Sequence, residues 1–88
     1  MAEAKPVLKV EVRSRQGVIF NGELGAVSSF NAVGPFDVLP GHINFVSMIE
    51  RKLELRRTDG RIEEFNVDNG VILVENNEVK VFIGVGEM

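Results

Sequence analysis

The strongest constraint on the fold is a series of short apolar runs that turn residues interrupt about every 8 to 12 residues. From Leu8 to Arg13 apolar and charged residues alternate strictly, so Leu8, Val10 and Val12 fall on one face of an extended chain. No stretch of about 10 or more residues has the period of an amphipathic helix. The pattern predicts an all-β domain, either a sandwich or a flattened barrel.

The turns are expected where asparagine, aspartate and glycine cluster, because these residues tolerate the backbone angles of tight turns. Asn21 and Gly22 give the strongest hairpin signal, so we expect the strand at residues 23–30 to pair back on the strand before it. Further turns are predicted at residues 58–61, 68–70 and 76–77. They separate strands predicted at residues 43–49, 52–56, 62–67, 71–75 and 78–85, with a short helical turn as the alternative for residues 43–49.

The most informative stretch, residues 34–42, contains two turn signals. Gly34 and Pro35 predict a sharp entry into a strand, because proline fixes φ and favours an extended residue before it. Pro40 and Gly41 have the composition of a type II turn, in which glycine takes the position with positive φ. His42, the only histidine, follows directly.

Residues 34–42, with the sequence GPFDVLPGH, resemble a segment near the start of the epsilon subunit of F-type ATP synthases, which is called delta in mitochondria. The similarity extends through residues 7–83 in unbroken order. The other matching segments are residues 8–12, 18–23, 65–74 and 76–81.

The resemblance implies a flattened antiparallel β-sandwich of about ten short strands. It places this domain at residues 7–85, after a flexible N-terminal segment at 1–6 and before a short tail at 86–88. The family's C-terminal helical hairpin has no counterpart before Met88. We therefore expect neither the inhibition nor the nucleotide sensing that this hairpin provides.

The sequence departs from the family in three places, each near a turn. Asp37 stands where glycine is usual, and Asn44 and Phe45 replace the common Ala-Pro. Residues 49–52 lack the usual glycine of the next turn. These departures affect local turn geometry and leave the predicted order of strands unchanged.

The function that the resemblance implies is a non-catalytic subunit of the central stalk, which joins the gamma subunit to the ring of c subunits during proton-driven ATP synthesis. The chain would be a monomer when isolated and peripheral to the membrane through the complex, on its cytoplasmic face. The alternative is a stand-alone β-sandwich binding or scaffold module that kept the fold. An enzyme is the third possibility.

By resemblance, one surface faces the c ring, and a flank of the sandwich packs on gamma. The residues of this surface are Asn31, Val33, Gly34, Pro35, Phe36, Asp37 and His42. Two questions about these residues remain open. The apolar residues of the loop either fold back as a plug or form an exposed contact patch. His42 either bonds within its turn, to a backbone carbonyl or Asp37, or contacts a partner.

Composition argues against several other functions. The net charge of −3 disfavours a nucleic-acid surface, and acidic residues interrupt the basic cluster between Arg51 and Arg61, which predicts a solvated hairpin of mixed charge. No apolar run reaches the ~18 residues of a membrane helix, and the first residues resemble neither a signal nor a transit peptide. The cytosol is therefore the expected compartment.

Catalytic chemistry has few residues to use. Nucleophilic catalysis would need His42 with Ser28, Ser29 or Ser47, and no motif selects any of them. One histidine without cysteine predicts no zinc or iron site, and no glycine-rich loop leads into a helix to bind a nucleotide. We therefore expect no cofactor.

Overall fold

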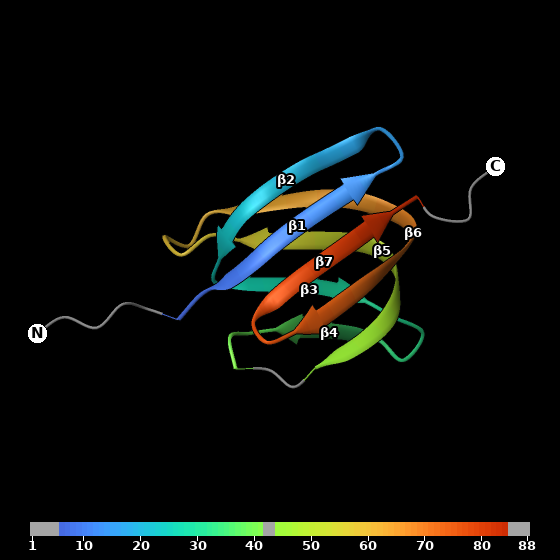
Figure 1. Cartoon of the computed structure of the whole chain (residues 1–88). Coiled ribbons are helices and arrows are strands. Elements are labelled where there is room, and N and C mark those ends of the chain that lie inside the picture. Colours follow the sequence, from blue (N-terminus) through green and yellow to red (C-terminus); the bar gives the residue numbers. More distant parts are fainter. Residues whose placement is uncertain (1–5, 42–43, 85–88) are drawn as a thin grey trace, which may run out of the picture.

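The computed structural model describes residues 6–41 and 44–84, and within these ranges the chain forms strands and no helix. The seven strands are β1 (Leu8–Ser14), β2 (Gly17–Leu24), β3 (Ala26–Phe30), β4 (Pro35–Val38), β5 (Phe45–Arg56), β6 (Ile62–Glu75) and β7 (Glu78–Ile83). They form one sheet in the order β2-β1-β7-β6-β5-β3-β4 (Figure 1). The predicted all-β class is confirmed.

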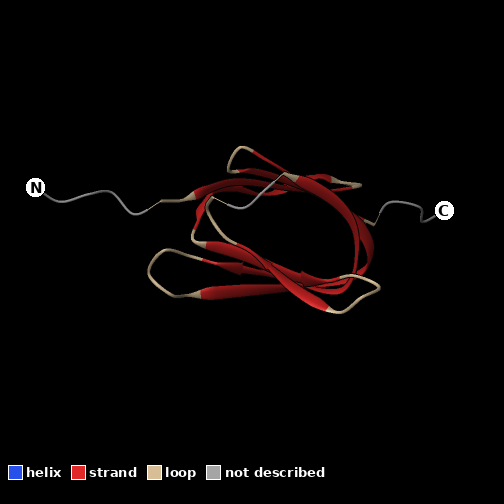
Figure 2. Ribbon diagram, turned by 90° about the horizontal axis from the view of Figure 1, so that it is seen from below, coloured by secondary structure: helices blue, strands red, loops and turns tan. Residues whose placement is uncertain are grey.

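The sheet folds over on itself because β5 and β6 each run through both layers. Residues 45–49 of β5 pair with residues 70–74 of β6, beside β7, β1 and β2. The rest of β5 pairs with the start of β6 and with β3. Figure 2 shows the two layers lying one above the other, joined by strands that curve round one side. Counting the halves of β5 and β6 separately gives nine strands, close to the expected number.

The side chains between the two layers form one apolar core. Alternation along the strands supplies it, and the predicted inward face of β1 (Leu8, Val10 and Val12) is fully buried. Val79 and Val81 of β7 are buried beside them, as their shared face predicted. The other core residues are Leu24, Val27, Val38, Ile49, Leu53, Leu55, Val67, Ile72 and Val74.

The fold-over needs a bend in the β5–β6 hairpin, and both strands are irregular there. Pairing slips between Ile49 and Arg51, and the register against β3 slips at the same level. Arg51 takes a φ of 74°, a left-handed backbone that costs an arginine about 1–2 kcal/mol. The hydroxyl of buried Ser29 donates to the Lys52 carbonyl at 2.7 Å, which gives this carbonyl a partner beside the irregular pairing.

The predicted turn at residues 68–70 is wrong, because β6 runs through these residues and bulges. Between its partners opposite Ile49 and Arg51, β6 advances from Gly70 to Val67, one residue more than β5 does. Gly70 is required there, because a Cβ on it would lie 2.6 Å from the Phe82 carbonyl oxygen. Composition typical of a turn thus serves a bend within a continuous strand.

The predicted turn at Asn21 and Gly22 is also wrong. Both residues lie inside β2, which pairs with β1 as far as Leu24, and β3 pairs with β4 and β5 instead of β2. The hairpin turns at residues 15–16. A longer β2 carries Leu24 into the core, where it is fully buried, and the Phe20 ring lies against the open side of Gly22. Burial of Leu24 outweighs the local turn preference.

Three other predicted turns are confirmed. Asn76 and Asn77 both have positive φ and join β6 to β7 as a two-residue hairpin loop. Gly41 has a φ of 84°, as the second central position of a type II turn requires. Residues 58–60 form the turn after β5. One pairing was not foreseen: β1 lies parallel to β7. In this pair, strands from the two ends of the chain meet inside the sheet.

We predict that Gly70→Ala destabilises the domain by about 2–3 kcal/mol, because the added methyl group would collide with the backbone of β7. Chemical denaturation with a far-ultraviolet signal measures this change. Gly25→Ala is the matched control, since its Cβ would meet neighbours only at ordinary contact distances of 3.7–3.8 Å. Equal denaturation midpoints for the two variants would contradict the close approach at Gly70.

Candidate functional site

The loop between β3 and β4 is held rigidly by Asn31. Its side-chain oxygen accepts the backbone N–H groups of Val33 (2.9 Å) and Gly34 (3.2 Å). The backbones of Asn31 and Gly34 also exchange hydrogen bonds of 2.9 and 3.1 Å. The Asn31 amide donates to the Ser47 hydroxyl on β5 at 3.3 Å, which fastens the loop to the neighbouring strand. Asn31 therefore shapes and anchors the loop.

The apolar residues of this loop and of β4 divide between the surface and the core. Val33, at the tip, is 96% exposed, and Pro35 is exposed. Phe36 points the other way: it packs on the core, with its ring edge-on to Phe45 at 5.9 Å between centroids. The loop therefore combines an exposed tip at Val33 with a Phe36 side chain that folds back onto the core.

Asp37, where the family usually has glycine, has a partner across the strand pair. The Ser28 hydroxyl donates to its carboxylate at 2.5 Å. Asp37 and Pro35 line a shallow hollow of about 140 Å³ with residues of β3 and β5. Phe30 also lines this hollow and lies beneath the Arg51 guanidinium. We refer to Phe30, Val33, Pro35 and Arg51 as the loop-end surface.

His42 lies outside the described residues, but the residues on either side of the gap are placed. The Gly41 N–H donates to the Asn77 side chain at 2.7 Å, and the Asn44 side chain accepts the Asn76 N–H at 2.9 Å. Both bonds tie the chain to the β6–β7 turn. Gly41 follows β4 and the loop of Val33 precedes it, so the two are at opposite ends of this strand (Figure 1).

Sequence reasoning did not identify Arg51 as a site residue. Its guanidinium lies over the Phe30 ring, 5.6 Å from the centroid, and its Nε is 4.0 Å from the Glu50 carboxylate. The stacking contributes about 0.5–1 kcal/mol and the exposed ion pair about zero, so together they offset only part of a cost of about 1–2 kcal/mol for its backbone conformation. One feature of the sequence could have identified Arg51: residues 49–52 lack the glycine that is usual in the family. Arg51 therefore occupies the position at which the bend requires a left-handed φ.

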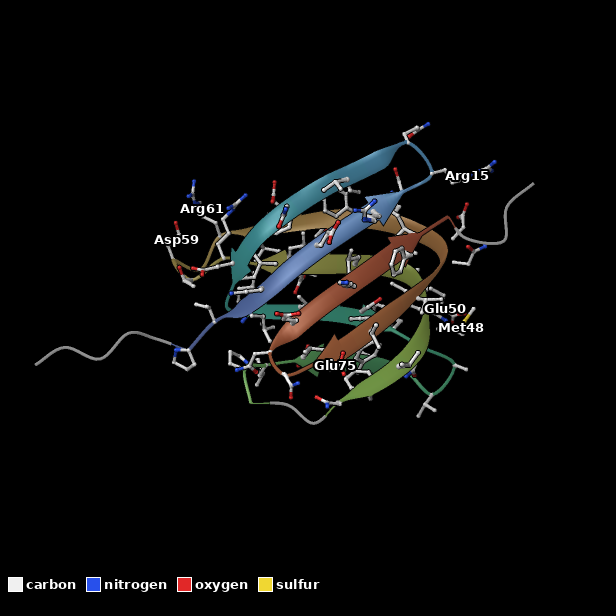
Figure 3. The ribbon with its side chains drawn as sticks, viewed as in Figure 1. Arg15, Met48, Glu50, Asp59, Arg61 and Glu75 are labelled. Carbon is white, nitrogen blue, oxygen red and sulfur yellow. The ribbon has the colours of Figure 1, made fainter. Side chains whose placement is uncertain are left out.

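A second feature missed from the sequence is an apolar patch on the outer face of β5, β6 and β7. Val46 and Met48 alternate with inward residues and are 65% and 64% exposed. They lie opposite Leu73 and Val71, and Val71 lies opposite Phe82. We call Val46, Met48, Val71, Leu73 and Phe82 the outer apolar patch. Figure 3 shows Met48 beside Glu50 where β5 bends, so the patch reaches the same end of the molecule as the loop.

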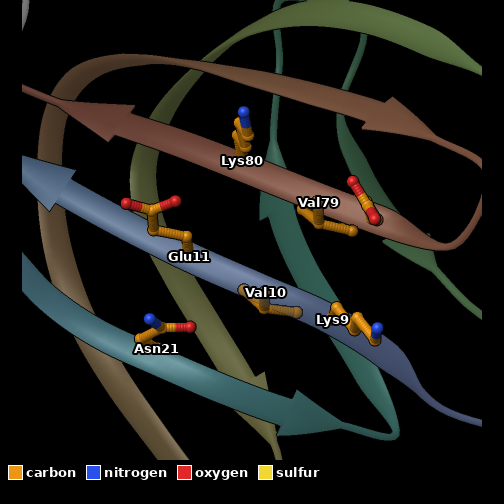
Figure 4. Close-up of a pocket in the computed structure, with 7 residues that line it drawn as sticks. Lys9, Val10, Glu11, Asn21, Val79 and Lys80 are labelled. Atoms are coloured by element: carbon orange, nitrogen blue, oxygen red, sulfur yellow. The ribbon is translucent and has the colours of Figure 1, made fainter.

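The outer face changes character towards β1 and β2. Lys9 lies opposite Glu78, and Glu11 opposite Lys80, in the parallel β1–β7 pair. These side chains line a shallow hollow of about 120 Å³ together with Asn21 (Figure 4). Alternating charges of this kind suit a solvated sheet face, so the apolar patch is a local feature of β5–β7.

Nothing in the described residues assembles a catalytic or metal centre. The three serines considered as nucleophiles serve the fold: Ser28 donates to Asp37, Ser29 to Lys52 and Ser47 to the Met48 carbonyl. Residues 6–41 and 44–84 hold no group of three side chains suited to a metal ion. In the same ranges no helix is long and apolar enough to cross a membrane.

The mixed-charge hairpin between β5 and β6 is stabilised locally, as its composition predicted. The backbone N–H of Arg61 donates to Asp59 at 3.0 Å, and the Arg61 guanidinium lies 2.9 Å from the same carboxylate. These contacts lower the pKa of Asp59, the backbone hydrogen bond most. Figure 3 places Asp59 and Arg61 at the end of the molecule opposite Met48, so this hairpin provides a control region for the loop-end surface.

Comparison with known proteins identifies relatives over most of the chain. Residues 7–87 match the sequence profile described as "ATP synthase, Delta/Epsilon chain, beta-sandwich domain". The ATP synthase epsilon chain of Wolinella succinogenes is 33% identical over 76 residues, which are 85% of this chain and 58% of the relative. That of Thermodesulfovibrio yellowstonii is 34% identical over 80 residues, 91% of this chain and 57% of the relative.

Solved structures share the fold at much lower identity. A chain of the Euglena gracilis mitochondrial ATP synthase, in a structure of OSCP, F1 and the c-ring, superposes with a TM-score of 0.83 and 16% identity. The superposition covers 93% of this chain and 53% of the Euglena chain. A chain of the Tetrahymena thermophila enzyme, in a structure of the central stalk and c-ring, gives a TM-score of 0.72, 10% identity and coverages of 92% and 66%. These similarities show a shared β-sandwich.

We predict that Arg51→Gly raises the free energy of unfolding by roughly 1 kcal/mol, because glycine takes positive φ without strain and only an exposed stacking contact is lost. Arg51→Ala keeps the strain and loses the contact, so it should lower stability slightly. Urea denaturation of both variants isolates the backbone effect. If the glycine variant is no more stable than the alanine variant, the left-handed conformation of Arg51 is wrong.

Proposed function

Because the chain belongs to the family of ATP synthase delta and epsilon chains, with their β-sandwich domain over residues 7–87, we propose that it is a non-catalytic subunit of the rotor stalk. In this role it joins the gamma subunit to the c ring and transmits torque without performing chemistry. The chain spans about 58% of the length of the curated relatives that it matches. The proposal therefore concerns what the β-sandwich itself contacts.

The observation that carries the proposal is the presentation of apolar side chains on rigid backbone at one end of the sandwich. Val33 sits at the tip of a loop that Asn31 fixes by four hydrogen bonds within the loop and one to β5. An ordered loop loses little entropy on binding, so most of the apolar area that it buries contributes to affinity. This arrangement suits a docking surface and offers no site for a reaction.

Two partners fit the two exposed features. We assign the loop-end surface to the c ring, following the family resemblance of residues 31–37. The outer apolar patch, which lies on regular strands, is assigned to gamma. Docking of Val46 and Met48 would remove from water the most exposed part of this patch, at about 25 cal/mol per Å².

On this proposal the chain is a monomer when isolated, and its position is peripheral, on the cytoplasmic face of the membrane that holds the complex. It needs no cofactor. Phe36 was expected to contact the c ring, but its packing on the core suits support of β4 instead. Val33 therefore replaces Phe36 as the residue that probes this contact.

For the c ring, we predict that Val33→Ser weakens attachment of the gamma-bound chain to c-ring membranes by about tenfold, near the value of one buried valine side chain. The denaturation midpoint should not change, because Val33 is 96% exposed. Ile62→Ser is the control, since Ile62 is an exposed apolar residue at the distant hairpin. Equal membrane attachment of the two variants in a sedimentation assay would refute the contact.

For gamma, we predict that Val46→Glu reduces affinity at least tenfold, because a carboxylate would be buried in an apolar contact. Calorimetry with purified gamma of the same organism measures the change. Val18→Glu is the control: Val18 is also an exposed strand valine, but β1, β7 and β6 separate its strand from β5. Undiminished binding of Val46→Glu would exclude the outer apolar patch as the gamma contact.

A further inference from the structure

Arg51 carries a positive charge that contributes little to the stability of the fold. Its side chain is 73% exposed, and its ion pair with Glu50 is long, at 4.0 Å, between two exposed groups. Such a pair contributes almost nothing to stability. Its backbone conformation is one that glycine adopts freely and arginine disfavours. An arginine that costs stability at this position indicates a role outside the fold.

The surroundings of Arg51 prepare its guanidinium for a partner. The Phe30 ring lies 5.6 Å from the guanidinium carbon and restricts where the side chain can go. Phe30 pairs across the strands with Glu50 on β5 and Pro35 on β4, directly before the loop that carries Val33. A side chain already ordered in this way loses less entropy on binding, and its planar fork matches a carboxylate through two hydrogen bonds.

We propose that Arg51 recognises a carboxylate on the c ring, next to the apolar contact at Val33. This inference rests on the proposed function and deepens it by naming the charge that the partner must carry. The occupant is thus a protein segment in which an acidic side chain lies beside an apolar one.

The charges near Arg51 argue against an anionic membrane surface as its partner. Anionic membranes attract clusters of several lysines and arginines. Here the neighbouring cation, Lys52, pairs with Glu64 at 3.7 Å, and Glu50 and Asp37 add negative charge nearby. A single cation among acidic residues suits one directed ion pair.

The test compares Arg51→Gln with wild type, both bound to gamma, for binding to purified c ring at low and moderate salt. We expect the variant to bind about tenfold more weakly and its affinity to depend less on salt, because one ion pair is lost. Arg51→Lys keeps the charge but not the planar guanidinium, so its affinity for the c ring should lie between those of wild type and Arg51→Gln. Arg61→Gln is the control, since Arg61 is equally exposed but lies at the opposite end.

Each other outcome has a distinct meaning. If wild type binds the c ring and Arg51→Gln binds equally well with the same salt dependence, the inference is overturned and the proposed function stands. If wild type itself does not bind, the proposed function fails, and this inference fails with it. Anionic vesicles without c ring are measured in parallel. Binding to them that is lost with Arg51→Gln would replace the carboxylate by a lipid phosphate and overturn the inference.

Discussion

The bend in the β5–β6 hairpin is the feature on which the rest of the structure depends. Two strands of 12 and 14 residues cross from one layer of the sandwich to the other, so a single sheet encloses its own core. The bend is possible because Gly70 lets β6 approach β7 closely and Arg51 turns β5 with positive φ. Ser29 gives the Lys52 carbonyl a partner at the same level. A side chain at Gly70, or an unpaired carbonyl at Lys52, would oppose the closure of the core.

The same bend also brings the proposed docking surfaces together. It turns Met48 and Glu50 to one end of the molecule (Figure 3), where Asn31 anchors the β3–β4 loop through Ser47. Arg51 follows Glu50 and lies over Phe30, directly before this loop. A loop fastened to a bent strand keeps its shape when a partner docks, so the apolar tip at Val33 and the charge at Arg51 stay in a fixed relation. A rotor contact has to transmit force, and rigidity of this kind suits it better than a mobile loop does.

Much of the fold followed from the sequence because apolar alternation directly reports which side of a strand is buried. The strand of Leu8, Val10 and Val12 was predicted on that basis and is confirmed. The turn at Asn76 and Asn77 was predicted from its residue types and is confirmed by their positive φ. Asn21 and Gly22 misled because a turn signal states only what the backbone tolerates, while burial of Leu24 decides what it does. The parallel pairing of β1 with β7 joins the two ends of the chain and leaves no local pattern.

The candidate site was only partly predictable for a similar reason. The resemblance pointed to the loop of Asn31 and Val33, but not to the inward turn of Phe36 or to the outer apolar patch, which requires the register of β5 on β6.

One measurement tests the proposed docking surfaces together: hydrogen–deuterium exchange of the chain, free and bound to a gamma–c-ring complex. We expect new protection in residues 31–34 and 45–48, and none in the hairpin at residues 58–61. Protection confined to that hairpin, or none anywhere, would contradict the proposed role.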